Sequence, residues 1–278
     1  MDPFYLRLIL AFVISGTWIT FATVAAEKFG STLGGVLVGM PSNIVVAFFF
    51  IGWTQGSQQL FNTTTPFPLT FAVNSIFLLV YAILARRGLI LGISGALFVW
   101  IVLEIPIVLW NVTNFSVALG AWLIIFLLCF WALEKQPGIR SQHKVTVSYT
   151  PASVMWRALL SGTMVSCAVV MSRIGGPMWG SVFASFPAVM TSTLIITSTS
   201  GGVDFSRSLT IPLLVSSQVN CMVYALVIRY TVLSLGVVEA TIVAYVCAML
   251  STYLTYNFMK VRQDSGAFHF TRRFFSRI

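Results

Sequence analysis

Charged side chains are scarce in this chain of 278 residues. They account for 8% of it, whereas hydrophobic residues account for 58%, and the mean hydropathy is +0.92. A soluble domain of this length carries about a quarter charged residues. It could not bury so much apolar surface in one core, so lipid must be the solvent. The composition excludes an ordinary soluble protein and predicts an all-α integral membrane protein.

Side chains that are common in catalytic and metal sites are also scarce. The two histidines, His143 and His269, fall in a polar loop and in the C-terminal tail. The four cysteines lie inside apolar stretches, without CxxC pairing or metal-ligand spacing. The sequence contains no carboxylate pair, phosphate-binding loop or Ser/His/Asp set. We therefore expect no enzyme, no metal site and no cofactor.

The apolar residues form runs that are long enough to cross a bilayer, which takes about 20 residues per helix. The predicted spans are 5–26, 33–54, 67–85, 89–110, 115–133, 153–173, 178–199, 208–232 and 236–259. One long polar connection, 134–150, separates the fifth span from the sixth, and a basic tail follows the last. The sequence thus predicts about nine transmembrane helices with the lipid bilayer as partner.

The basic residues give the net charge of +9, and their distribution predicts the orientation. They sit between spans and in the tail, so no stripe of them could follow a phosphate backbone, and we expect no nucleic-acid partner. With the N-terminus outside, all of the 16 Lys and Arg residues except Arg7, Arg173 and Arg229 fall on the cytoplasmic side. The positive-inside rule therefore places the C-terminus in the cytoplasm.

Two parts of the chain resemble each other. Residues 16–56 align without gaps on residues 162–202, with Pro41 matching Pro187, and the same offset pairs Asn74 with Asn220. We predict a first four-helix repeat over 1–112 and a second over 151–260, followed by the tail 261–278. The segment 113–150 adds one linking helix and a cytoplasmic loop, so the second repeat is inserted upside down. Inverted repeats are typical of secondary transporters, whose sites lie near the midplane.

The second helix of each repeat carries small residues just before a proline, a pattern that breaks apolar helices at transporter sites. These residues are Gly39 and Pro41, with Asn43 following, and Ser185 and Pro187. A helix that starts at each proline would direct its N-terminal dipole at the centre and favour an anionic or carbonyl-bearing ligand. The alternative is a packing kink, since Gly and Pro are common in membrane helices.

Uncharged polar side chains inside other spans extend the candidate pathway to Asn74, Thr191, Gln218 and Asn220. Buried amides in lipid need partners, so they face the bundle interior and either line a polar path or hydrogen-bond between helices. Glu104 is an intramembrane acid and a candidate proton- or cation-coupling group. Its alternative is a water-facing residue in a helix that ends early, near Pro106.

The first half resembles a known family in three features. These are K-F-G-S-T-L-G-G-V-L-V-G-M-P-S at 28–42, G-S-Q-Q-L-F at 56–61, and the helix that contains Asn74. Here it is similar to the GlpM family of small bacterial inner-membrane proteins, which are single units of about four helices. The second half is similar from Arg173 to Asn220. The resemblance implies a fused, inverted pair of such units in the inner membrane, although the helix 115–133 and Ser185 in place of Gly39 depart from it.

Architecture and polar residues together suggest a secondary transporter or permease for a small solute, with its pathway between the repeats. One alternative is a membrane scaffold that assists envelope or polysaccharide assembly without transporting anything. Another is a lipid-handling protein, which would have a lateral opening to lipid rather than a closed cavity at the midplane.

Overall fold

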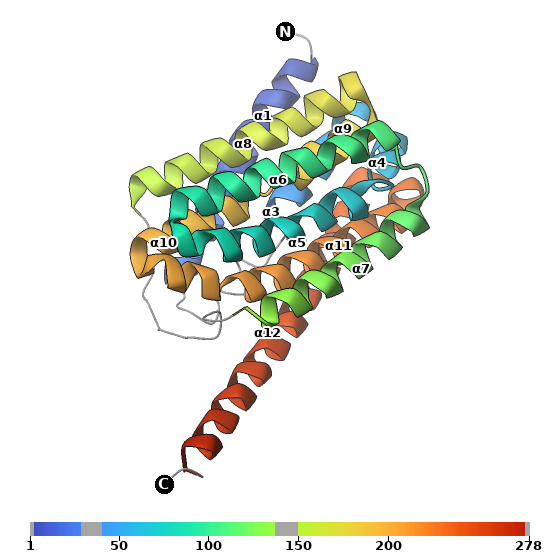
Figure 1. Ribbon diagram of the computed structural model, residues 1–278. Coiled ribbons are helices and arrows are strands. Elements are labelled where there is room, and N and C mark those ends of the chain that lie inside the picture. The colour runs from blue at the N-terminus through green and yellow to red at the C-terminus, as the bar shows by residue number, and fades with distance from the viewer. Residues whose placement is uncertain (1–2, 29–40, 137–149, 276–278) are drawn as a thin grey trace.

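The computed structural model describes residues 3–28, 41–136 and 150–275, and it is helical almost throughout (Figure 1). These residues contain no strand. The helices are α1 (Pro3–Lys28), α3 (Ser42–Gln55), α4 (Ser57–Thr63), α5 (Phe67–Leu84), the 3₁₀ turn η1 (Ala85–Arg87), α6 (Leu89–Trp110), α7 (Phe115–Glu134), α8 (Pro151–Gly175), α9 (Pro177–Ser185), α10 (Ala188–Ser208), α11 (Thr210–Leu235) and α12 (Val237–Phe275).

Eight stretches of the described chain are long and apolar enough to cross a membrane. They are the first 19 residues of α1, α5 with η1, α6, α7, α8, α9 with α10, α11 and the first 25 residues of α12. The protein is therefore an all-α, multi-pass membrane protein. The remaining predicted span, 33–54, begins in residues outside the described part, and its described end is the 14-residue helix α3.

Several boundaries differ from those predicted. The span 178–199 is two helices, α9 and α10, separated by a break at Phe186 and Pro187. The last helix does not end near 259 but continues to Phe275 and projects beyond the bundle (Figure 1). Residues 261–275 contain no proline and a single glycine, Gly266, so nothing in this stretch forces the helix to stop.

The helices differ in how much of their surface is buried. Along α3, eight of the 14 residues are buried, among them Phe48, Phe50 and Ile51. By contrast, α6, α7 and α12 leave large apolar side chains exposed, for example Leu109 and Ile124. In a bilayer those side chains face lipid tails, so helix association depends on close packing and on hydrogen bonds between helices.

Hydrogen bonds connect residues that precede α7 in the sequence to residues that follow it. Gln55 donates from Nε2 to the Val169 carbonyl oxygen at 3.0 Å, and Gln59 donates to the Ser172 carbonyl oxygen at 2.9 Å. At the other end of the bundle, Arg207 donates from Nε to the Ala82 carbonyl oxygen at 2.9 Å. Arg207 is thus a buried interhelical donor rather than a loop charge.

Gly56 and Gly202 adopt the same rare backbone conformation. Their φ/ψ values are 92°/163° and 83°/167°, a region that residues with a Cβ avoid. Gly56 ends α3 and Gly202 kinks α10, so the short segment that follows each glycine changes direction. The two positions are a pair in the alignment of residues 16–56 on residues 162–202.

Substituting Gly202 with alanine should therefore destabilise the protein by about 1–3 kcal/mol, the usual cost of a residue held in such a region. The measurement is the Tm of the purified protein in detergent. The control is Gly201→Ala, one residue earlier and not at positive φ, where alanine is neutral or slightly stabilising. Equal Tm values for the two variants would contradict this account of Gly202.

Candidate functional site

The break between α9 and α10 exposes backbone groups inside the bundle. Phe186 is extended, at φ −51° and ψ 130°, and Pro187 has no N–H to donate. Because the chain leaves the helical conformation at Phe186, the Ser185 carbonyl oxygen loses the N–H donor that the residue four positions later supplies in a regular helix. It accepts a hydrogen bond of 2.8 Å from Nδ2 of Asn74 on α5.

Both polar atoms of the Asn74 side-chain amide form hydrogen bonds. It is 1% exposed, and its Oδ1 accepts a hydrogen bond of 2.9 Å from Nε1 of Trp100 on α6. One side chain thus connects α5, α6 and the end of α9. Because an unpaired amide is costly in lipid, this pairing holds the broken helix against its neighbours.

A second helix starts at a proline in nearly the same way. Pro41 precedes α3 with φ −74° and ψ 58°, and Pro187 precedes α10 with φ −77° and ψ 44°. Each proline carbonyl accepts the first helical hydrogen bond, from Val45 and Thr191 respectively. In the described part of the chain neither helix has a side-chain cap. The N–H of Ala188 at the start of α10 donates to the Phe186 carbonyl oxygen at 2.8 Å, and the other N–H groups of the two first turns are available to other acceptors.

Both helix starts open on one cavity of about 70 Å³. That is room for a few water molecules, since each needs roughly 10–15 Å³ on this measure. Its polar lining residues are Ser42, Asn43, Asn74, Ser185, Ser216 and Ser217. Its other lining residues are Pro41, Ile44, Phe71, Ala184, Phe186, Pro187, Val189, Met190, Leu213 and Cys221. None of these described residues is charged.

Five predicted pathway residues meet at this cavity: Pro41, Asn43, Asn74, Ser185 and Pro187. Gly39 lies outside the described residues. Oδ1 of Asn43 is buried and has no hydrogen-bond partner among the described residues. The cavity is therefore lined by hydroxyl groups, two helix N-termini and Asn43, whose amide oxygen has no donor in the described part of the chain.

Three predicted residues lie elsewhere. Gln218 accepts from Nε1 of Trp122 at 2.7 Å and donates to the Phe71 carbonyl oxygen at 3.0 Å. Asn220 donates to Oγ of Ser216 at 3.1 Å, and its Oδ1 accepts from Ser251. Thr191, one turn into α10, is buried and does not line the cavity. The two amides hold helices together.

Replacing Trp122 with phenylalanine should destabilise the protein by about 1–2 kcal/mol, because it leaves the buried Gln218 oxygen without its donor. The Tm in detergent measures this effect. Trp110→Phe is the control, since Trp110 is exposed at the end of α6. If both variants have the same Tm, the Trp122–Gln218 hydrogen bond makes no measurable contribution to stability.

Glu104 lies outside the cavity but inside the bundle. It is 3% exposed, and neither carboxyl oxygen has a hydrogen-bond partner among the described residues. It sits one helical turn beyond Trp100 on the same face of α6. The helix continues through Pro106 to Trp110, so Glu104 is not at an early helix end, contrary to the alternative considered from sequence.

Some cavity and cavity-supporting residues were not singled out from sequence. Phe71, Phe186 and Cys221 are apolar and carried no signal that separates them from core residues. Trp100 and Trp122 did carry a sequence signal, because an indole N–H inside a membrane span needs an acceptor. Both tryptophans bond to an amide that the sequence did identify.

No family model, curated protein or solved structure matches this chain. The chemistry of the cavity must therefore indicate its use. Among the described residues there is no group of three His, Cys, Asp or Glu side chains that could hold a metal ion. The cavity can form hydrogen bonds with a small solute and, at the two helix N-termini, can stabilise one negative charge.

Proposed function

We propose that this protein is a secondary transporter or permease for a small solute that is neutral or carries a single negative charge. The observation that supports the proposal is the shared cavity at the starts of α3 and α10, two helices that begin at proline inside the bundle. Broken helices that face one internal site are the recurring arrangement of transporter binding sites. The uncharged lining argues against a multiply charged substrate.

The proposal includes an inverted duplication. Matching φ/ψ values at Pro41 and Pro187, which begin α3 and α10, support a common origin of 1–112 and 151–260. The linking helix α7 then makes the two repeats antiparallel, with nine spans, the N-terminus outside and the C-terminus in the cytoplasm. A fused pair of GlpM-like units in the inner membrane fits this proposal.

The position of the cavity supports a pathway between the repeats. Its walls come from α3 and α5 of the first repeat and from α9, α10 and α11 of the second. A rocking motion of one repeat against the other would open these walls alternately to the two sides, as in other transporters with inverted repeats. Hydrogen bonds between the repeats, such as that from Asn74 to the Ser185 carbonyl oxygen, would then break and form again during the cycle.

The deciding experiment is solute flux into proteoliposomes that contain the purified chain, across a panel of small neutral, anionic and cationic solutes. We expect flux of one neutral or monoanionic class. A folded protein that moves no member of a broad panel would refute transport and favour a membrane scaffold.

Thiol labelling tests access to the cavity directly. In a chain whose four native cysteines are replaced, Ser185→Cys should react with a hydrophilic methanethiosulfonate reagent, because the cavity is polar and would open to water during the cycle. Val246→Cys, on the exposed apolar face of α12, is the control and should stay unreacted in lipid. A Ser185→Cys thiol as inert as the control would mean a dry cavity and count against a pathway.

A further inference from the structure

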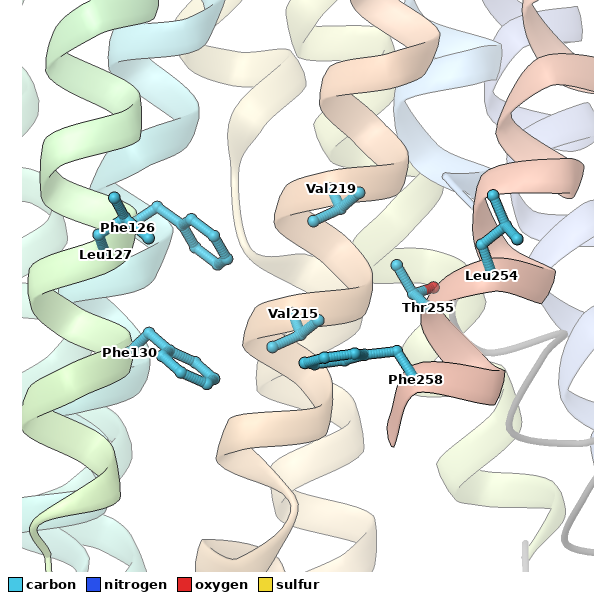
Figure 2. Close-up of a pocket in the computed structure, with 8 residues that line it drawn as sticks. All are labelled: Phe126, Leu127, Phe130, Val215, Val219, Leu254, Thr255 and Phe258. Atoms are coloured by element: carbon cyan, nitrogen blue, oxygen red, sulfur yellow. The ribbon is translucent and has the colours of Figure 1, made fainter. Parts of the chain in front are cut away.

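A second, larger hollow lies on the outside of the bundle. It is a groove of about 380 Å³ between α7, α11 and α12. Its lining residues are Phe126, Leu127, Phe130, Val215, Val219, Leu254, Thr255 and Phe258. Figure 2 shows the rings of Phe126 and Phe130 pointing from α7 toward α11, and the ring of Phe258 reaching from α12 toward Val215.

The groove offers an occupant almost nothing but hydrocarbon. Its one polar side chain, Thr255, donates to the Ser251 and Thr252 carbonyl oxygens at 3.1 and 3.0 Å, and lies 3.4 Å from Oδ1 of Asn220. That hydroxyl is therefore satisfied within the protein. A ligand bound here has to be apolar over the length that contacts the groove.

A basic residue follows the last groove residue on each of α7 and α12. Lys260 follows Phe258 by two residues on α12, and Lys135 follows Phe130 by five residues on α7. Both lysines are exposed. Nζ of Lys135 lies 3.4 Å from the ring centre of the exposed Trp131, an arrangement typical of the membrane–water interface.

We propose that this groove binds one acyl chain of an anionic phospholipid, whose phosphate lies between Lys135 and Lys260. The apolar lining fits the chain, and the two ammonium groups complement the headgroup charge, as in other basic sites at the cytoplasmic ends of transmembrane helices. The site is independent of the proposed solute pathway. That cavity lies on a different side of α11, where Ser216 and Ser217 rather than Val215 and Val219 form the lining.

The shape of the lining favours a lipid chain over a second copy of the protein. Helices that pack closely in membranes do so through small residues, which let their backbones approach. Here the lining side chains are mainly Phe, Leu and Val, which keep a further helix at a distance and leave a space that a single flexible chain can fill.

Photocrosslinking tests the proposal with the full chain in phosphatidylcholine nanodiscs. The probe is phosphatidylglycerol with a diazirine on one acyl chain, added in trace amounts, and the modified residues are identified by mass spectrometry. We expect modification concentrated on the groove residues of α7 and α12. Modification spread over all exposed apolar side chains, such as Leu109 and Ile242, would overturn the proposal. A chain-to-chain contact that covers the groove would also overturn it.

Two pairs of variants make the test specific. Val219→Trp fills the groove and should lower crosslinking at Phe126 and Phe130 by about ten-fold, which corresponds to 1.4 kcal/mol. Leu250→Trp, on exposed α12 surface outside the groove, should not. Removing the headgroup contact with Lys135→Gln and Lys260→Gln should reduce the preference for the anionic probe by about five-fold per lysine. The exposed Arg87→Gln controls for general surface charge, and equal losses in the lysine variants and this control would refute the headgroup site.

Discussion

Replacing Asn74 with leucine should lower solute flux by at least about ten-fold, since one unpaired buried polar group costs about 1–3 kcal/mol. Leucine has a similar size but no hydrogen-bonding groups. It leaves the Ser185 carbonyl and the Trp100 indole without their partners and removes an amide from the cavity wall. The measurement is the initial rate of flux per folded protein in proteoliposomes.

Asn220→Leu is the matched control for that variant. Asn220 is as deeply buried as Asn74, occupies the aligned position and also bonds to neighbouring side chains. No part of it lines the cavity, so we expect a lower Tm but nearly unchanged flux. If both variants lose flux equally, the effect comes from weakened packing rather than from the cavity.

The membrane-spanning helices could be predicted well because hydropathy and length decide them. The predicted span 89–110 coincides with α6, and 115–133 falls one residue short of α7. The break within 178–199 was visible as Pro187, but where α9 stops could not be predicted. The end of α9 depends on Asn74, which lies on a helix more than 100 residues earlier in the sequence. Asn74 donates a hydrogen bond to the Ser185 carbonyl oxygen, which the end of the helix leaves without a backbone donor.

The candidate site was predicted in part, and the reason lies in helix geometry. Pro41 and Pro187 each lie directly before the start of a helix, and this proline signal could be read from the sequence. Gln218 and Asn220 lie on a regular helix, where small rotations decide which polar residue faces a cavity. On α11 it is Ser216 and Ser217 that line it, while Gln218 is taken up by Trp122.

Glu104 is the candidate ion-coupling group of the proposed transporter. Around the cavity, the described polar groups can bind a solute, but they carry no charge that could respond to a proton gradient. Glu104 is on the face of α6 that carries Trp100, the donor to Asn74. Glu104 is deeply buried and has no hydrogen-bond partner among the described residues, and an ionised carboxylate in that position costs several kcal/mol unless a proton or a cation accompanies it. We propose that this cost links solute movement to an ion gradient.

Glu104→Gln should therefore abolish gradient-driven accumulation while leaving passive exchange of the solute intact. For one proton per solute, a gradient of one pH unit supports about ten-fold accumulation in the unmodified protein, and the variant should reach a ratio of about one. Glutamine keeps the size of the side chain but cannot release a proton. Glu239→Gln, at the exposed start of α12, is the control. Accumulation that survives in Glu104→Gln would exclude this residue from coupling, and loss of both accumulation and exchange would assign it to binding or structure instead.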